Sequence, residues 1–328
     1  MATYKGIQGY SVQKLSSDPT ASEAVGQLWY NSTAGKFKIS VEGAGAWATG
    51  GALNTNRSRI SGCGTATSGL AIAGVNGGPQ MAVVEKYDGS TWTEIADVNT
   101  AREAGGSSRN SPSANTLYFA GNSTANSESW NDTSWSATPA LNTARSGVGG
   151  AGNSSTSALC FAGEHPPTAV TEKFDGSAWT TVNSMNTARA YLAGTGIVTA
   201  ALAIGGDYAP AQVANVEKYD GTSWTELTGN LNTVRSSNAA AGTTALAITM
   251  GGYNAASTYL TICETWNGTS WSAQANMAIA KGSTPDGFGT STAAVCSGGG
   301  NPAYTPTKLD STEEWTDPVY TIKTVTVS

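Results

Sequence analysis

One motif recurs along the chain at intervals of about 44 residues. Seven tryptophans are separated by 45, 43, 44, 45, 47 and 44 residues: Trp47, Trp92, Trp135, Trp179, Trp224, Trp271 and Trp315. A period in the forties is characteristic of β-propeller blades and of some helical solenoids. We therefore expect one structural unit repeated around or along an axis.

Two charged columns accompany the tryptophans. A basic residue follows at an offset of ten residues, or eleven for Arg235: Arg57, Arg102, Arg145, Arg189, Arg235 and Lys281. A glutamate lies seven residues before five of the tryptophans: Glu85, Glu128, Glu172, Glu217 and Glu264. Residues present in every repeat serve the repeated fold, so we interpret all three columns as structural. The basic and acidic columns are predicted to form charge-assisted pairs near the junctions between repeats, and the tryptophans to pack between neighbouring repeats.

The amino-acid sequence of each repeat predicts four short strands and no helix. A run rich in Gly, Ala and Ser follows the NTAR motif, and an apolar run such as GLAIAG or ALAIGG comes next. After a loop of variable length come an alternating segment (VEKYDG) and a final strand (SWTEL). The Asp-Gly of YDGTSW predicts a tight hairpin turn between the third and fourth strands. The expected fold is all-β, a β-propeller of four-stranded blades.

The number of blades is open to two interpretations. Six repeats start near residues 53, 98, 141, 185, 231 and 277. GQLWYN, GKFKIS and AWATG predict three strands before them, and VYTIKTVTVS predicts one after them. We favour seven blades closed by the C-terminal strand, which would leave no open edge; the alternative is six blades with N-terminal hairpins outside. The corresponding domains are an attachment segment, residues 1–24, and a propeller, residues 25–328.

Composition limits the classes of partner. The net charge of −6 and a pI near 4.9 argue against a nucleic-acid surface. No apolar run is long enough for a membrane span, and the first residues do not resemble a secretory signal. The four cysteines lack the spacing of a metal site and are expected to be small buried side chains: Cys63, Cys160, Cys263 and Cys296.

Particular segments resemble known proteins. GLAIAG…VEKYDGSTW and ALAIGG…VEKYDGTSW resemble kelch-like propeller repeats, over roughly residues 25–328. GQLWYNSTAGKFKIS resembles a module of bacteriophage tail-fibre and virion-associated proteins, and the whole chain is similar to virion structural proteins of marine tailed bacteriophages. The resemblance implies a particle-attached propeller, made in the host cytoplasm and located in the virion. Residues 1–24 would then contact other virion proteins.

The sequence predicts no enzyme, no cofactor and no metal site. His165, in FAGEHPPTAV, is the only histidine, and no serine and carboxylate are singled out to form a triad with it. A copper site needs several imidazoles. Glycosidases need paired carboxylates in one pocket, whereas the glutamates here recur in every blade.

Function on a repeated scaffold is expected where the repeats differ. The loops between the second and third strands vary most and carry His165, Tyr208, Tyr253, Tyr259 and Tyr304. In a propeller these loops share one face with the segments entering each blade, so we expect a crown of loops around a ring of basic side chains. Tyrosine with Asn, Gly and Ser suits recognition, and an anionic or neutral host-surface polysaccharide is the expected ligand. Three alternatives remain open: loops that drift neutrally in length, a capsid or tail decoration or assembly protein without a receptor, and a cellular lectin-like propeller.

Overall fold

The structure, a computed structural model, describes residues 12–21, 23–24, 26–42, 45–164, 166–208, 211–256, 258–304, 307–317 and 320–326. All regular elements in this part of the chain are β-strands, and none of it forms a helix able to cross a membrane. The chain divides into two compact units, which we call the terminal unit (Met1–Ala46 with Asp317–Ser328) and the repeat unit (Trp47–Thr316). The division therefore lies near residues 46 and 317, and not at the predicted residue 24.

The terminal unit contains one four-stranded sheet built from both ends of the chain. Its strands, in spatial order, are β1 (Gln13–Leu15), β2 (Leu28–Asn31), β3 (Lys36–Glu42) and β30 (Tyr320–Thr324). β1 runs parallel to β2, and the other two pairings are antiparallel. Asp18 fixes the connection after β1, because its Oδ1 accepts hydrogen bonds from Trp29 Nε1 at 3.0 Å and Asn31 Nδ2 at 2.6 Å.

The repeat unit contains six four-stranded sheets, numbered here in chain order. Sheets 1 to 3 are formed by β5 (Ser61–Thr65), β6 (Ser68–Val75), β7 (Gln80–Tyr87) and β8 (Trp92–Ile95); by β9 (Gly106–Ser107), β10 (Thr116–Phe119), β11 (Ser127–Trp130) and β12 (Trp135–Thr138); and by β13 (Gly149–Ser154), β14 (Ser157–Phe161), β15 (Thr171–Phe174) and β16 (Trp179–Val182). In each of these sheets the spatial order of the strands follows the chain.

Sheets 4 to 6 follow the same plan with one exception. They are formed by β17 (Ala193–Ile197), β18 (Ala200–Ile204), β21 (Val216–Tyr219) and β22 (Trp224–Glu226); by β23 (Ala239–Gly242), β24 (Ala247–Met250), β25 (Cys263–Trp266) and β26 (Trp271–Ala273); and by β27 (Asp286–Gly289), β28 (Ala293–Ser297), β29 (Thr312–Thr316) and β4 (Ala46–Thr49). A separate two-stranded ribbon, β19 (Asp207–Tyr208) and β20 (Ala211–Gln212), lies in the sheet 4 loop. Sheet 6 thus takes its fourth strand from the N-terminal part of the chain.

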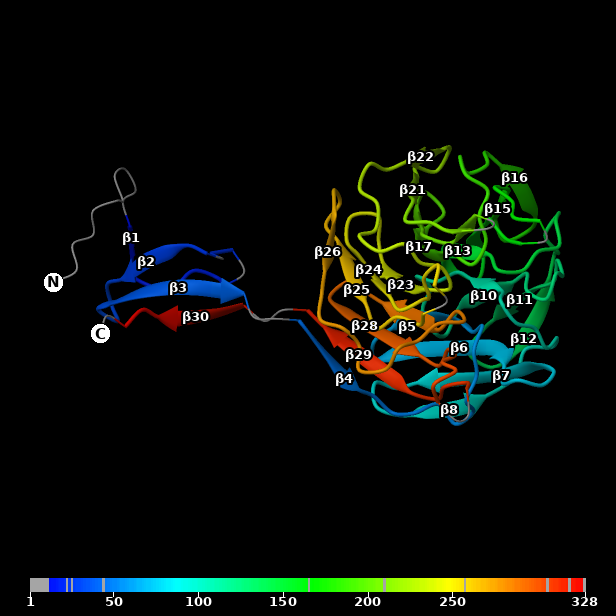
Figure 1. Cartoon of the computed structure of the whole chain (residues 1–328), viewed down its shortest axis with the longest axis horizontal. Coiled ribbons are helices and arrows are strands. Elements are labelled where there is room, and N and C mark those ends of the chain that lie inside the picture. Colours follow the sequence, from blue (N-terminus) through cyan, green and yellow to red (C-terminus); the bar gives the residue numbers. More distant parts are fainter. Residues whose placement is uncertain are drawn as a thin grey trace. The chain divides into compact units, whose positions relative to one another are not determined.

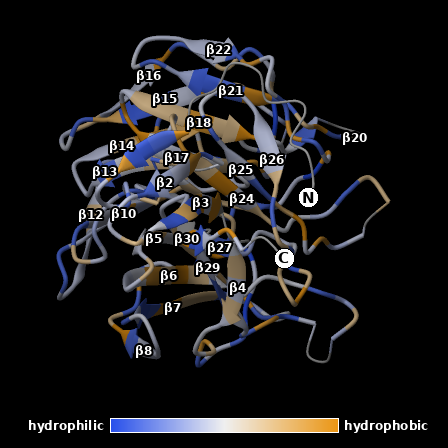
Figure 2. Ribbon diagram, turned by 90° about the vertical axis from the view of Figure 1, so that its left-hand side faces the viewer, coloured by the Kyte–Doolittle hydropathy of each residue, from blue (hydrophilic) through white to orange (hydrophobic). Residues whose placement is uncertain are grey.

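The six sheets are arranged in a cycle, which makes the repeat unit β-propeller-like. The first strands are neighbours in the order β5, β9, β13, β17, β23 and β27, and β27 is again next to β5. Figure 1 shows first strands such as β5, β17 and β23 toward the middle of the unit, and fourth strands such as β8, β16 and β22 at its edge. The inner β6 and β18 are mostly hydrophobic (Figure 2).

This strand pairing differs from the favoured seven-blade interpretation. The C-terminal strand β30 pairs with β3 in the terminal unit, whereas residues 46–49, expected in the same blade as β2 and β3, complete sheet 6. Trp315 consequently lies on a third strand and not in the fourth-strand column. Its ring is 5.5 Å from that of Trp47, the same separation as between Trp266 and Trp271 in sheet 5.

The predicted basic–acidic pairs are confirmed, and sheet 4 shows how they work. Arg189 Nη2 donates to Glu217 Oε1 at 2.9 Å, while Nη1 donates to the carbonyls of Gly205 and Asn215 at 2.8 and 2.7 Å. Glu217 Oε2 accepts from the backbone N–H and the side chain of Asn186, which arrives from sheet 3. The corresponding buried pairs are Arg57–Glu85, Arg102–Glu128, Arg145–Glu172, Arg235–Glu264 and Lys281–Glu313. Each pair ties the incoming chain to the third strand of its sheet.

The fourth-strand tryptophans pack between neighbouring sheets, as predicted. Trp224 is 5% exposed, its ring lies 4.9 Å from Phe161 of sheet 3, and its Nε1 donates to Thr171 Oγ1 of the same sheet at 3.0 Å. The hairpin turn is also confirmed. Gly221 has a φ of +97°, and Asp220 Oδ1 accepts hydrogen bonds from the backbone N–H groups of Thr222 and Ser223. These shared residues therefore hold the sheets together.

One turn breaks the repeat pattern and reaches the first strands of the other sheets. Asn110, between β9 and β10, bonds to backbone groups in β13, β17 and β23: its N–H donates to Gly152 O at 2.8 Å, Oδ1 accepts from Gly196 N at 3.0 Å, and Nδ2 donates to Gly242 O at 2.7 Å. Its neighbour Arg109 donates to Gly287 O of β27 at 3.1 Å. The sequence analysis did not predict this turn, which fills the space between the first strands.

Candidate functional site

The loops between second and third strands share a face with the segments that enter the first strands. Backbone bridges join the two sets: Ser146 to Glu164, Ala190 to Asp207, Ser236 to Tyr253 and Gly282 to Gly300. The predicted common face is therefore present. We call it the loop face; its loops are residues 76–79, 120–126, 162–170, 205–215, 251–262 and 298–311.

The predicted tyrosines divide into two groups. Tyr208 and Tyr304 are 54% and 42% exposed. Tyr253 and Tyr259 are half-buried, with ring centroids 6.2 Å apart. His165 lies outside the residues that the structure describes. Only two of the predicted contact residues are thus shown to be freely accessible.

The half-buried tyrosines make polar contacts to neighbouring sheets. Tyr253 Oη donates to Asp207 Oδ2 at 3.3 Å, and Tyr259 Oη lies 3.3 Å from Ser283 Oγ. Burial raises the pKa of Asp207, although hydroxyl donors including Tyr253 oppose that effect. These tyrosines therefore help to fix the loops as well as shaping the surface.

The expected ring of basic side chains is not displayed on this face. Arg57, Arg102, Arg145, Arg189, Arg235 and Lys281 are all buried. Their charged groups are used by the acidic column and by backbone carbonyls, as shown for Arg189 above. The prediction was wrong because it considered the positive charges without the acidic side chains and carbonyls that pair with them. The basic column therefore adds no positive charge to the surface of the loop face.

A cycle of backbone hydrogen bonds lies where the chain enters each first strand. Two residues after each basic residue of the column, φ is between 50° and 63°. The bonds, with N–H donors first, run Ala104 to Arg59 (3.0 Å), Gly147 to Ala104 (2.8 Å), Tyr191 to Gly147 (2.8 Å), Ser237 to Tyr191 (2.7 Å), Thr284 to Ser237 (3.2 Å) and Arg59 to Ser283 (2.8 Å). We call these residues the entry ring. The left-handed conformation is costly for side chains other than glycine, and its recurrence in all six repeats assigns it to the repeated fold.

A cavity of about 260 Å³ adjoins the entry ring, and we call it the entry cavity. Its lining residues are Arg59, Glu103, Ala104, Asn122, Ser123, Ser146, Glu164 and Tyr191. Arg59 Nη1 donates to Glu103 Oε1 at 2.9 Å, and Ser146 Oγ donates to Glu164 Oε1 at 2.8 Å. The cavity therefore combines a guanidinium, two carboxylates, hydroxyls and one aromatic ring.

Electrostatics in the entry cavity favours fixed charge states. Burial, and then a hydrogen bond with Glu164, raise the pKa of Tyr191, so its hydroxyl remains a donor. Burial alone would lower the pKa of Arg59, but the neighbouring Glu103 raises it overall. Arg59 and Tyr191 therefore both act as hydrogen-bond donors across the neutral pH range.

The loop at one side of the entry cavity is strained. Residues 120–123 have φ values of 56°, 90°, 49° and 54°, and only the second of them is glycine. Backbone hydrogen bonds also tie this turn to other segments, from Gly121 N to Arg145 O at 2.9 Å and from Asn122 N to Glu103 O at 3.0 Å. The first two left-handed residues recur in the other repeats, as at Ala73 and Ala162, whereas Asn122 and Ser123 have no left-handed counterpart among the described residues. The strain at Asn122 and Ser123 points to a functional constraint.

The entry cavity was not predicted from the sequence, although Glu103 is a signal for it. Glu103 directly follows a basic residue of the column, where the other repeats have Ser58, Ser146, Ala190, Ser236 and Gly282. A carboxylate found in one repeat only is not needed by the repeated fold. Comparison of all columns, and not only of tyrosines in loops, would have identified it.

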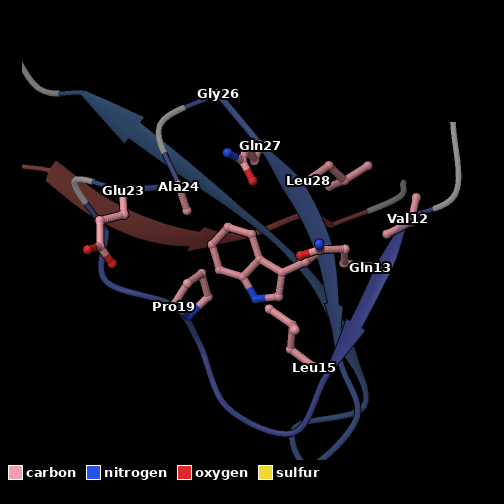
Figure 3. Close-up of a pocket in the computed structure, with 10 residues that line it drawn as sticks. Val12, Gln13, Leu15, Pro19, Glu23, Ala24, Gly26, Gln27 and Leu28 are labelled. Atoms are coloured by element: carbon pink, nitrogen blue, oxygen red, sulfur yellow. The ribbon is translucent and has the colours of Figure 1, made fainter.

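The terminal unit has a separate apolar cleft of about 660 Å³ beside Trp29. Leu15, Pro19 and Ala24 point toward its centre (Figure 3). The described part of the predicted attachment segment therefore folds onto the terminal sheet, where it forms one wall of this cleft.

No known protein family matches the sequence, and no curated protein matches it either. Within the described residues, no three His, Cys, Asp or Glu side chains are grouped to hold a metal ion. The four cysteines are buried and free, as expected, and burial raises the pKa of the Cys63 thiol to about 11.

Proposed function

We propose that residues 47–316 form a closed, six-bladed, kelch-like β-propeller whose last blade is completed by β4. The cyclic order of the first strands and the cycle of hydrogen bonds in the entry ring support closure. Completion by an early strand gives the last blade four strands like the others and covers the outer edge of β29, which would otherwise be unpaired.

This propeller is a non-enzymatic binding protein of a virus particle, which displays the loop face to a polysaccharide on the host surface. One observation carries this proposal: the basic and acidic columns that the repeats share are buried, whereas the loops in which the repeats differ bear the exposed Tyr208 and Tyr304. Exposed tyrosine offers ring area at low entropic cost and a hydroxyl for hydrogen bonding. The virion location follows the resemblance of the sequence.

The buried state of the basic column favours a neutral polysaccharide over an anionic one. Binding of an anionic polymer gains most of its strength from accessible Lys and Arg. Arg59 is the cation of the entry cavity, and it is paired with Glu103. Stacking and hydroxyl hydrogen bonds are therefore the main contacts expected.

Binding to cells tests this function. Labelled protein is expected to bind saturably to a suitable strain in a panel of marine bacteria. The double variant Tyr208→Ala, Tyr304→Ala should lose most of that binding, while Leu246→Ala should keep it. Leu246 is a matched control because it is 51% exposed but lies in the turn between β23 and β24, away from the loop face. Equal loss in both variants, or no binding by folded protein, contradicts the proposal.

A decoration or assembly role is the second candidate, and the terminal unit favours it. Four of its side chains are exposed although apolar: Val12, Leu28, Phe37 and Val325. Exposed apolar groups on a small unit indicate contact with another protein, here other virion proteins. A chain without the terminal unit should fail to enter particles under this function, and normal incorporation would contradict it.

A further inference from the structure

We propose that the entry cavity binds one neutral sugar residue through two adjacent hydroxyl groups. This inference rests on the proposed function and names the site and ligand class within it. It uses residues at the entry ring that the sequence analysis did not select.

The polar groups of the cavity suit a pair of hydroxyls. Each sugar hydroxyl donates one hydrogen bond and accepts others, so it fits best between a donor and an acceptor. The Arg59–Glu103 pair offers this combination, because a guanidinium has five N–H donors and a carboxylate about four acceptor positions, and only one contact of 2.9 Å joins them. Arg59 is 42% exposed on its side chain, so part of this fork faces solvent.

Size and charge narrow the ligand. Pockets for drug-sized molecules occupy roughly 300–1,000 Å³, so a cavity of about 260 Å³ accommodates a single sugar ring and not a longer oligomer. Its described lining includes two carboxylates, Glu103 and Glu164, and one guanidinium. That balance disfavours uronic acids and other anionic sugars.

The cavity is also held in shape before a ligand arrives. Arg59, Ala104 and Tyr191 belong to the entry ring, whose backbone bonds link them to neighbouring sheets. The left-handed turn at residues 120–123 is tied to Glu103 O and Arg145 O. Such preorganisation lowers the entropic cost of binding. The strained turn at residues 120–123 would therefore serve to fix the cavity in its binding shape.

The test uses defined monosaccharides and the full chain. Methyl glycosides of glucose, galactose and mannose are compared with the methyl glycoside of glucuronic acid by saturation-transfer NMR and calorimetry. At least one neutral glycoside should bind, and the glucuronide should not. Glu103→Gln should weaken that binding by at least about tenfold, the effect of losing a charge-assisted hydrogen bond.

Two further variants keep the test decisive. Asn122→Gly removes a lining side chain and keeps the left-handed backbone, so it should fold normally and still weaken binding of the glycoside. Leu246→Ala should leave monosaccharide binding unchanged, since Leu246 lies in the turn between β23 and β24 and does not line the cavity. Tighter binding of the glucuronide, or unchanged affinity in both Glu103→Gln and Asn122→Gly, would overturn the inference.

Binding to cells separates this inference from the function on which it rests. If cells bind the protein through Tyr208 and Tyr304 but no neutral glycoside binds, the site is wrong and the function stands. If folded protein binds neither cells nor glycosides, both fail.

Discussion

Asp286 makes the stability of the repeat unit depend on pH in a predictable direction. Its side chain is fully buried on β27, and its carboxylate has no side-chain hydrogen-bond partner among the described residues. Burial raises its pKa from 3.8 to about 7, although Arg109, 3.8 Å away, acts in the opposite direction. The folded protein therefore keeps a proton on Asp286 at pH values where the unfolded chain has lost it.

The sign and size of the effect follow from this difference. Because the folded-state pKa is the higher one, the contribution is complete below about pH 4 and is lost as the pH rises through about 7. A difference of about three units, at about 1.4 kcal/mol each, corresponds to about 4 kcal/mol. We expect the free energy of unfolding of the repeat unit to fall by an amount of this order between these two pH values.

The assay is urea unfolding followed by tryptophan fluorescence, at several pH values between about 4 and 8. Asp286→Asn cannot ionise and should reduce the fall in stability, while Asp97→Asn, at an exposed position, should not. The other charged or titratable groups acting on Asp286 are Arg57, Cys63 and Cys296; burial raises the pKa of Cys63 to about 11 and raises that of Cys296 as well, so neither thiol ionises in this range. A wild-type protein with constant stability, or an Asp286→Asn variant with an unchanged pH dependence, would refute the reasoning.

Three further outcomes are expected. Trp224→Ala should lower the free energy of unfolding by roughly 3–5 kcal/mol, because its ring fills the space next to Phe161; an unchanged urea midpoint would contradict this packing. Glu217→Gln should cost about 3 kcal/mol by leaving Arg189 without its charge partner in a buried site, and urea unfolding that matches the wild type would show the pair to be dispensable. A chain lacking residues 317–328 should keep the thermal transition of the repeat unit, since β30 pairs only with β3 among the strands that the structure describes; a lower calorimetric midpoint for that transition would contradict the pairing.

The repeat itself was predictable because each local signal is tied to a local contact. The Asp-Gly turn, the Trp column and the Arg–Glu pairs all appear in the structure with the expected partners. Two of these contacts lie within one sheet, and the Trp contact reaches an adjacent sheet. Sequence periodicity reports such interactions directly, since every repeat must satisfy them.

Arg109 and Asp286 are residues that a search for repeated positions does not select, because each occurs in one repeat only. Arg109 stands where the other repeats have glycines with positive φ (Gly64, Gly152, Gly196, Gly242 and Gly289), and Asp286 is the charged member of a column otherwise filled by small residues. An analysis built on shared residues passes over single exceptions. Yet a buried charge is costly and persists only with a reason, so these exceptions are informative.

The position of Trp315 shows that short offsets within a repeat carry more information than the long period. In the five complete repeats a glutamate precedes the third-strand aromatic by two residues and the fourth-strand tryptophan by seven, because those aromatics lie opposite each other across one hairpin, as in Tyr219 and Trp224. Glu313 precedes Trp315 by two residues, and Lys308 occupies the position seven before it. The local offset therefore assigns Trp315 to a third strand, although its spacing of 44 residues from Trp271 matches the fourth-strand column and its distance from the third-strand Trp266 is 49 residues. A last repeat that ends at its third strand needs a fourth strand from elsewhere in the chain. The strand β4 fills that place, and its Trp47 has no glutamate seven residues before it because it is separated in sequence from its third strand.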